Sequence, residues 1–386
     1  MVISTHEITS SRGRHIIIQY APQLDGLRAV AVACVLAFHF IPGVDRYAPL
    51  GAMGVRLFFV LSGFLITGIL LSWRGQPVGV ALQTFYARRA LRIFPLFYFV
   101  LLAAAVLNIG PVRDTFAWHA TYLSNAYFYL RGDWHGSVSH LWSLAVEEQF
   151  YLVWPWLILC APERWLRPVI VAMIALAPLS RLLFPHPMDS VLPTSCLDSL
   201  GLGALVALAS HQGGAYRTFA SAGSVLVSAT LLLRYLGLGG QYQIVGLDFG
   251  VSLLSAWLVG RAASGFAGVA GAFLSSSAAI AVGRISYGLY VYHGFTPYLL
   301  GRYVTDFMTM PLPVRVTLLA ATTLLIAAAS WRWLEQPFLR LKPRLDVSLN
   351  PEITKSPDQD SNSPNHEVAR SPDSPVTISA SPTSSP

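Results

Sequence analysis

Apolar residues recur along the chain in blocks of about twenty, and short polar segments separate these blocks. A helix of that length spans the hydrocarbon core of a bilayer, which is roughly 30 Å thick. We therefore predict about ten membrane-spanning helices, at residues 27–44, 54–72, 93–110, 143–161, 168–184, 197–212, 218–236, 246–262, 278–300 and 314–335. The predicted fold class is an all-α polytopic membrane protein whose helices surround a polar channel.

The composition agrees with this pattern. Of the 386 residues, 54% are hydrophobic and 12% are charged, and the mean hydropathy is +0.53. These values exclude a chain that is disordered throughout, a coiled coil and a disulfide scaffold, and they argue against a soluble globular fold. Cys34, Cys160 and Cys196 lie far apart in mostly apolar surroundings and lack the spacing of a metal site. We interpret them as core fillers and predict no metal.

The net charge of +7 indicates orientation in a lipid bilayer rather than binding to nucleic acid. Ten spans put both termini on one side of the membrane. With the N-terminus inside, the inner segments before the tail carry about twice as many basic residues as the outer segments. This bias predicts the N-in, C-in orientation.

The two ends of the chain differ from its middle. Residues 1–22 are polar and lack the features of a secretory signal, so we expect a cytoplasmic N-terminal segment. Residues 23–344 form the predicted membrane domain. Residues 345–386 are rich in Ser and Pro and contain no aromatic residue. Such a composition buries too little apolar surface to fold, so we predict a disordered cytoplasmic tail and no soluble second domain.

The first candidate site combines Asp25, Arg28 and His39. A charge near the bilayer centre costs roughly 2.5–3.5 kcal/mol on insertion scales, so each one needs a reason. Arg28 and His39 are eleven residues apart, which puts them on one helix face about 16 Å apart along the axis. This spacing suits a long ligand with an anionic head and a reactive far end, such as acyl-coenzyme A, with Asp25 holding Arg28. Alternatively, Arg28 anchors the topology and His39 bonds to a neighbouring helix.

The second candidate site is a group of arginines, Arg88, Arg89 and Arg92, in a segment that we expect to be a cytoplasmic loop leading into the third span. Arginine binds phosphate through paired hydrogen bonds, and Arg89 and Arg92, one helical turn apart, can grip one phosphate. Alternatively, the positive-inside rule alone accounts for these residues.

A third cluster, within 140–151, enters its span from the outer side. Ser143 and Glu147 share a helix face, Glu148 lies about 100° round the helix, and Tyr151 follows. We expect one carboxylate to orient His39 or an acceptor hydroxyl and the other to pair with an arginine. An interfacial position that reduces the cost of two carboxylates is the alternative.

The fourth cluster lies at 283–293. Tyr287, Tyr290 and His293 fall at steps of three residues and predict an aromatic packing stripe with hydrogen-bonded tips. Arg284 and Glu335 are expected on the same side of the membrane, which makes an ion pair between them plausible.

The second span carries a further polar residue at its outer end, Arg56, to which we assign no role. Ser62 and Gly63, within the same span, predict a close approach of a neighbouring helix.

Taken together, these residues resemble the acyltransferase-3 family of bacterial membrane O-acyltransferases. The similarity extends over about residues 20–342 and rests on segments 24–39, 54–67, 89–95, 141–155 and 283–293, followed by 335–338. Any one segment is a weak signal, whereas five in this order are specific. The resemblance implies transfer of an acyl group, usually acetyl, from cytoplasmic acyl-coenzyme A to a hydroxyl of a carbohydrate or another small acceptor. It implies a multi-pass protein of the bacterial cytoplasmic (inner) membrane.

The resemblance also implies which positions are functional, namely Arg28, His39, Arg89, Arg92, Glu147 and Glu148. We expect His39 to act as general base on the acceptor hydroxyl, because an imidazole titrates near neutral pH. A covalent acyl-His39 intermediate is the less favoured variant. The arginines, Arg88 among them, would bind the phosphates of the donor, which is a co-substrate rather than a bound cofactor. Larger members carry a C-terminal SGNH domain, so this chain is expected to transfer directly or with a separate periplasmic transferase.

Several acceptors fit this interpretation: cell-surface polysaccharide, lipid-linked oligosaccharide, peptidoglycan, a glycolipid or a secreted macrolide. The competing class is a transporter or flippase for a lipid-linked or exported glycan, since intramembrane Arg, Glu and His suit that function too. A transporter would favour two matching halves, and we find no internal repeat. A sensor or scaffold would leave the intramembrane charges unexplained.

Overall fold

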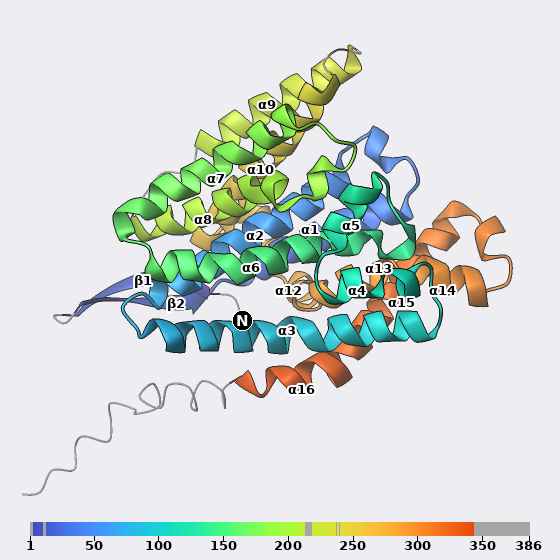
Figure 1. Ribbon diagram of the computed structural model, residues 1–386, viewed down its shortest axis with the longest axis horizontal. Coiled ribbons are helices and arrows are strands. Elements are labelled where there is room, and N and C mark those ends of the chain that lie inside the picture. Colours follow the sequence, from blue (N-terminus) through green and yellow to red (C-terminus); the bar gives the residue numbers. More distant parts are fainter. Residues whose placement is uncertain (1–2, 11–12, 213–217, 237, 239, 343–386) are drawn as a thin grey trace, which may run out of the picture.

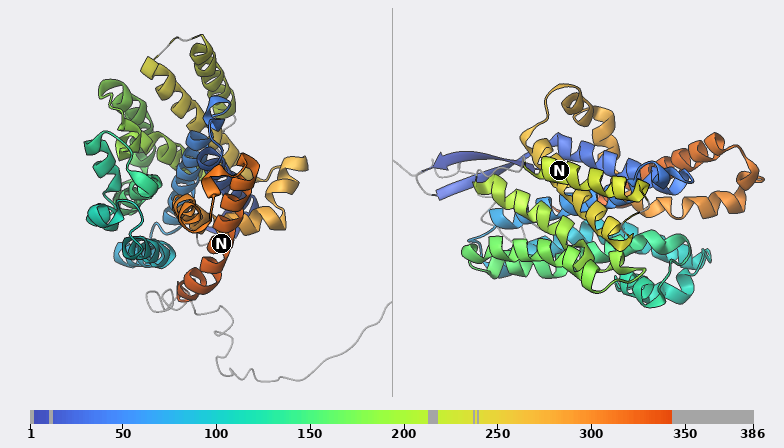
Figure 2. Two further views of the ribbon diagram at one scale, coloured as in Figure 1. Left: turned by 90° about the vertical axis from the view of Figure 1, so that its right-hand side faces the viewer. Right: turned by 90° about the horizontal axis from the view of Figure 1, so that it is seen from above.

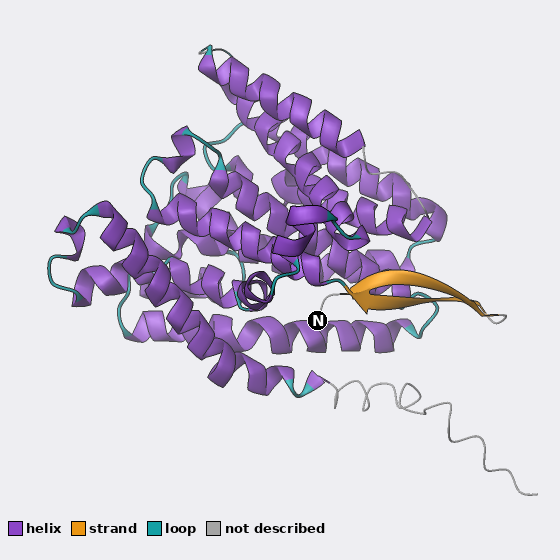
Figure 3. Ribbon diagram, turned by 180° about the vertical axis from the view of Figure 1, so that it is seen from behind, coloured by secondary structure: helices purple, strands orange, loops and turns teal. Residues whose placement is uncertain are grey.

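The computed structural model describes residues 3–10, 13–212, 218–236, 238 and 240–342. Nearly all of this part of the chain is helical (Figure 3). The long helices run alongside one another (Figure 1) and are α1 (Pro22–Phe40), α2 (Leu50–Ser72), α3 (Val78–Val106), α6 (Trp142–Cys160), α7 (Glu163–Leu183), α8 (Leu197–Gln212), α9 (Thr218–Tyr235), α10 (Gly240–Ser264) and α15 (Leu312–Ser330).

Seven helices of the described residues are long and apolar enough to cross a membrane: Pro22–Phe40, Leu50–Ser72, Val78–Val106, Glu163–Leu183, Pro193–Ser210, Val245–Ser264 and Leu312–Leu339. This finding confirms the predicted class, an all-α membrane protein. The number of ten spans and the N-in orientation stay predictions. The helix α6, which carries Glu147 and Glu148, is not among the seven, and α9 contains a shorter apolar segment, Ser221–Leu233.

The predicted ninth span, 278–300, is wrong as a single helix. It consists of α12 (Ser277–Arg284), α13 (Ser286–His293) and α14 (Thr296–Tyr303). Pro297 lies in the first turn of α14, where its missing N–H has no helical partner to lose. The short α14 lies at one end of the bundle, opposite the end from which the N-terminal strands project (Figure 1).

The prediction of a loop before the third span is also wrong, because α3 already begins at Val78 and includes Arg88, Arg89 and Arg92. Neither Gly nor Pro occurs between Gly79 and Pro95, so nothing in this segment interrupts the helix. Pro95 lies inside α3, as membrane helices tolerate. One continuous helix therefore carries all three arginines.

The N-terminal segment forms two antiparallel strands, β1 (Ile3–Ser10) and β2 (Gly13–Tyr20), in register from Ile3 opposite Tyr20 to Ser10 opposite Gly13. Shorter elements connect the long helices: η1 (Val44–Arg46), α4 (Val112–Ala120), α5 (Ser124–Arg131), η2 (Gly136–Leu141), η3 (Asp189–Val191), η4 (Pro193–Cys196), α11 (Gly268–Leu274), η5 (Phe307–Thr309), η6 (Trp331–Glu335) and α16 (Gln336–Leu339). The predicted tail, 345–386, lies outside the described residues.

The cysteines are free in this structure, and their surroundings differ. Cys196 is buried, Cys34 is half-buried and Cys160 is exposed. The interpretation as a core filler therefore holds for Cys196 and is wrong for Cys160.

The helix α2 lies inside the bundle, where it packs against α1, α6, α8 and α10 (Figure 2). Two glycines allow it to approach α8 closely. A Cβ atom on Gly63 would lie 2.0 Å from the carbonyl oxygen of Leu200, and one on Gly203 would lie 2.1 Å from that of Val60. The predicted close approach at Gly63 is therefore confirmed. The helix α2 contributes residues 51–56 to one of the two cavities described next and residues 55–66 to the other.

Candidate active site

A cavity between α1, α2, α3, α6 and α13 brings together most of the residues that we predicted to be functional. It encloses about 880 Å³, part of which is open to solvent. Its polar lining residues are Arg28, Ser62, Arg89, Arg92, Ser143, Glu147, Glu148, Tyr151, Ser286, Tyr287 and Tyr290. We call it the arginine cavity.

Three arginines give this cavity its positive charge. Arg28 forms the predicted salt bridge with Asp25, at 3.3 Å, and the Asp25 side chain is buried. The guanidinium carbon of Arg89 lies 5.7 Å from the ring centroid of Tyr151, and that of Arg92 lies 5.1 Å from the ring of Trp331. An aromatic face holds a guanidinium without occupying its N–H donors, so the contact with Tyr151 leaves the donors of Arg89 available for an anion.

Arg88 lies elsewhere. Helical spacing alone does not separate it from Arg92, because residues four apart share a helix face, and the difference lies in the side-chain contacts. The guanidinium carbon of Arg88 lies 5.1 Å from the ring of Trp73, and Arg88 is not part of the described lining of the arginine cavity. The geometry supports the predicted donor-binding role for Arg89 and Arg92 but not for Arg88.

Arg92 also joins the cavity to Glu335, the buried residue that ends η6. Arg92 Nη1 lies 3.9 Å from Glu335 Oε2, and Arg92 Nη2 donates to the carbonyl oxygen of Arg284 at 3.3 Å. Arg92 thus contacts both the backbone of Arg284 and the side chain of Glu335, two residues that we predicted to lie on one side of the membrane. The contact of Arg92 with Glu335 was not predicted.

The carboxylates of Glu147 and Glu148 line the same cavity as the arginines. Glu147 Oε1 accepts a hydrogen bond of 2.6 Å from Ser62 Oγ, which itself accepts one of 3.0 Å from the Tyr151 hydroxyl. Glu148 lines the same cavity. His39 lines a different cavity, so the arrangement does not support the predicted orientation of His39 by a carboxylate, and the pairing of a carboxylate with an arginine stays a prediction.

The second cavity lies at the C-terminal end of α1. It encloses about 1170 Å³, again including space open to solvent. Its lining consists of Val35, Phe38, His39, Gly51, Ala52, Val55, Arg56, Trp134, Ser139, His140, Trp142, Ser190, Asp248 and Tyr290. We call it the histidine cavity.

The hydrogen bonding of His39 fixes which ring nitrogen can act as a base. Nδ1 lies 2.9 Å from the carbonyl oxygen of Val35. Because a carbonyl only accepts, Nδ1 must carry a proton, and Nε2 of the neutral ring keeps its lone pair. The His39 ring packs edge-on against His293, with 4.7 Å between the ring centroids, which limits its rotation. His39 is thus an oriented proton acceptor in an open cavity.

His39, His293 and His140 form a row of rings. His293 is fully buried, bonds through Nδ1 to the carbonyl oxygen of Tyr290 at 2.5 Å, and lies 4.6 Å from His140 between ring centroids. The hydroxyls of Tyr287 and Tyr290 donate to the carbonyl oxygens of Ile93 and His140 at 2.9 and 3.0 Å. These bonds match the predicted packing stripe with hydrogen-bonded tips. The position of His140 beside His293 was not predicted.

The two cavities share a wall. Val55 and Tyr290 line both of them. The hydroxyls of Tyr290 and Ser143 lie 2.5 Å apart, so Ser143 is bonded into the wall. Arg28 and His39 therefore open into neighbouring cavities from the two ends of one helix, α1.

Arg56 and Asp248 also line the histidine cavity, and we assigned neither of them a role from the sequence. The sequence contained one indication of this pair: an Arg and an isolated Asp inside otherwise apolar segments. Burying either charge in a membrane costs free energy unless the two side chains pair.

The apolar helices thus enclose a cavity lined by three arginines beside a cavity that contains an oriented histidine. The acyltransferase domain family matches residues 22–332, and the chain belongs to this family. The match confirms the family predicted from the sequence.

Individual relatives agree with this assignment. The chain is 38% identical over 151 residues to a putative peptidoglycan O-acetyltransferase of Bacillus subtilis, covering 36% of this chain and 23% of the relative. It is 34% identical over 158 residues to the peptidoglycan O-acetyltransferase OatA of Listeria monocytogenes, covering 36% and 24%. It is 25% identical over 353 residues to a putative O-acetyltransferase of Staphylococcus aureus strain COL, covering 83% and 57%. The chain thus spans only part of these relatives' length. No solved structure matches it.

Proposed function

We propose that the protein transfers an acyl group, acetyl in the first instance, from acyl-coenzyme A in the arginine cavity to a hydroxyl of an acceptor in the histidine cavity. The observation that carries this proposal is the shared wall of Val55 and Tyr290 between the two cavities. A donor whose phosphates lie at Arg28, Arg89 and Arg92 can extend its thioester past this wall toward His39. The separation of about 16 Å along α1 matches an extended donor rather than a compact one.

In this proposal, the chemistry needs one base and one good leaving group. His39 Nε2 takes the proton of the acceptor hydroxyl while the oxygen attacks the thioester carbonyl. The carbon–sulfur bond then breaks, and the imidazolium returns the proton to the departing thiolate. The products are the acyl ester and free coenzyme A, so atoms and charge balance without another reactant. The Val35 carbonyl keeps His39 in the required tautomer throughout.

We propose a carbohydrate as the acceptor. The named relatives in Bacillus subtilis and Listeria monocytogenes are described as peptidoglycan O-acetyltransferases, and peptidoglycan is a carbohydrate polymer. This support comes from aligned segments that cover about a third of this chain, so the acceptor and any separate periplasmic transferase belong to the proposal. We place the protein in the bacterial cytoplasmic membrane.

The purified chain in detergent should release coenzyme A thiol from acetyl-coenzyme A, and should acetylate a soluble N-acetylglucosamine oligosaccharide, without any ion gradient. Thiol release and labelled product are the measurements. A transporter or flippase would leave acetyl-coenzyme A intact. A chain that binds this oligosaccharide and releases no thiol would therefore contradict the enzyme and favour the transporter.

We also propose that the arginine cavity opens to the cytoplasm. In a variant without the native cysteines, a membrane-impermeant maleimide added to intact cells should label Tyr47→Cys, because Tyr47 is 90% exposed and lies between α1 and α2. The same reagent should label Gly79→Cys, at the start of α3, only after the membrane is permeabilised. The reverse pattern would put the arginine cavity outside.

A further inference from the structure

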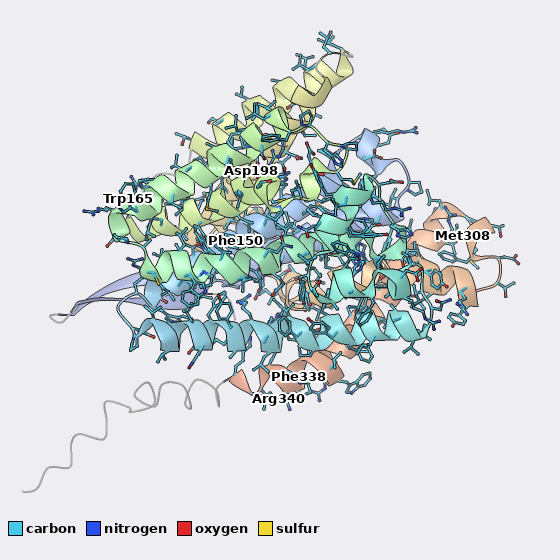
Figure 4. The ribbon with its side chains drawn as sticks, in the orientation of Figure 1. Phe150, Trp165, Asp198, Met308, Phe338 and Arg340 are labelled. Atoms are coloured by element: carbon cyan, nitrogen blue, oxygen red, sulfur yellow. The ribbon has the colours of Figure 1, made fainter. Side chains whose placement is uncertain are left out.

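Four charged side chains that the proposed chemistry does not use meet beside the histidine cavity. Arg56 on α2 contacts Asp198 on α8 at 2.8 Å and Asp248 on α10 at 2.5 Å. Arg181 on α7 contacts Asp198 at 2.5 Å. We call these four residues the Arg56 network. Asp198 lies inside the bundle, among α7, α8 and α10 (Figure 4).

The network is buried and electrically balanced. The exposed fractions are 4% for Arg56, 2% for Arg181, 0% for Asp198 and 7% for Asp248. Two arginines and two aspartates cancel in charge, but removing four ions from water costs much of what their attraction returns, and apolar packing often stabilises a fold as well. A purely stabilising role, in which the network links α2, α7, α8 and α10, therefore explains these buried charges poorly. The position of the network beside the histidine cavity suggests a further role.

Two of the four residues reach the histidine cavity, Arg56 and Asp248, in the lining that also contains His39. Arg56 is bonded to several protein groups: Nη1 donates to the Ser195 carbonyl oxygen, to Asp198 and to Ser199, and Nη2 donates to Asp248. Among the described residues, the Asp248 carboxylate is bonded through Oδ2 only. Its second oxygen, Oδ1, is the charged acceptor that remains for a ligand.

Aromatic side chains complete this part of the cavity. Trp134 and Trp142 line it together with Asp248, and Trp134 is 43% exposed. A carboxylate oxygen accepts from hydroxyl groups, and the face of an indole covers an apolar C–H surface. A sugar ring presents both hydroxyl groups and an apolar C–H face, and so it fits a carboxylate beside indole rings.

We propose that Asp248 Oδ1 accepts a hydrogen bond from a hydroxyl of the acceptor next to the one that is acylated, and so determines which hydroxyl reaches His39. Arg56 is a positioning residue that holds Asp248 charged and in place, whereas Asp198, outside the described lining, pairs with Arg56 and Arg181 inside the bundle. This proposal rests on the proposed function, because it assumes that the acceptor enters the histidine cavity. It assigns acceptor recognition to α2 and α10 and donor binding to α1 and α3.

The test compares two substitutions in the same network, only one of which faces the cavity. Asp248→Asn replaces the charged acceptor by a neutral one of the same shape, and Asp198→Asn makes the same change at a residue outside the described lining. With acetyl-coenzyme A and the N-acetylglucosamine tetramer as probes, Asp248→Asn should raise the KM for the tetramer roughly tenfold, because a charge-assisted bond becomes a neutral one. The KM for acetyl-coenzyme A should stay within about twofold. Asp198→Asn should lower Tm and leave both KM values within about twofold.

A purely structural network would affect both variants alike, so equal changes in the KM for the tetramer would overturn the proposal. If Asp248→Asn does not fold, Asp248→Glu decides the matter, because it keeps the charge and moves the carboxylate by one methylene. The proposal expects Asp248→Glu to raise the KM for the tetramer or to change the position of the ester, and an unchanged KM and position would overturn it. Wild-type protein that cleaves acetyl-coenzyme A through His39 but neither binds nor acylates the tetramer would overturn this acceptor assignment and leave the proposed function standing.

Discussion

His39→Gln should lower the rate of acyl transfer by about 10² to 10⁴ while the protein still binds acetyl-coenzyme A. Glutamine is polar, of similar size, and can still donate to the Val35 carbonyl oxygen that His39 Nδ1 contacts at 2.9 Å. It cannot take a proton near neutral pH, which is the property that the proposed base requires. Donor binding should persist because Arg28, Arg89 and Arg92 line the other cavity. The measurement is labelled product from purified protein, beside the Kd for the donor.

His119→Gln is the matched control for this substitution. His119 is fully buried on α4, bonds through Nδ1 to the carbonyl oxygen four residues before it at 2.9 Å, and belongs to the described lining of neither cavity. It should keep nearly normal turnover at matched protein level. Nearly normal turnover of His39→Gln would contradict the assignment of His39 as base, and equal losses in both variants would indicate a fold defect.

Arg89→Ala should weaken binding of acetyl-coenzyme A by ten- to a hundredfold, since the loss of a charge-assisted hydrogen bond costs roughly 1.5–3 kcal/mol. Arg89 is expected to bind a phosphate that does not react, so its removal should raise KM for the donor far more than it lowers kcat. Calorimetry or a fluorescent donor analogue provides the Kd. The Arg92→Ala variant should behave similarly, with an added loss of stability from the unpaired, buried Glu335.

Arg88→Ala removes the same charge from the neighbouring position of the same helix. Arg88 lies over Trp73 rather than in the arginine cavity, so its removal should change the Kd for the donor less than threefold, roughly a charge effect at a distance. If Arg88→Ala and Arg89→Ala weaken binding equally, net charge rather than a directed contact binds the donor.

Much of the site was predictable because the bilayer makes each buried charge conspicuous. Arg28, Glu147 and Glu148 interrupt apolar runs, and the structure puts all three in the arginine cavity. The pairing of Asp25 with Arg28 was also predictable, since residues three apart share a helix face. The pairing of Asp25 with Arg28 is a local relation, and helical periodicity alone establishes it.

The remaining features depend on contacts between distant segments. The meeting of Arg56 with Asp198 and Asp248 spans 142 and 192 residues of sequence, and no local pattern contains it. The contact of Arg88 with Trp73 was not predicted, because we expected a loop at this position, whereas the segment belongs to α3. The ninth span was misjudged because hydropathy does not distinguish one helix from three short ones in the same apolar surroundings.

The central claim is that donor binding and proton transfer belong to two neighbouring cavities, which share Val55 and Tyr290 as wall residues. The most direct test measures the Kd for acetyl-coenzyme A and the kcat at saturating donor on His39→Gln and Arg89→Ala side by side. The account predicts opposite patterns: His39→Gln keeps its Kd and loses kcat, whereas Arg89→Ala loses affinity and keeps most of its kcat. If both variants lose only affinity for acetyl-coenzyme A, or both lose only kcat, the account is contradicted.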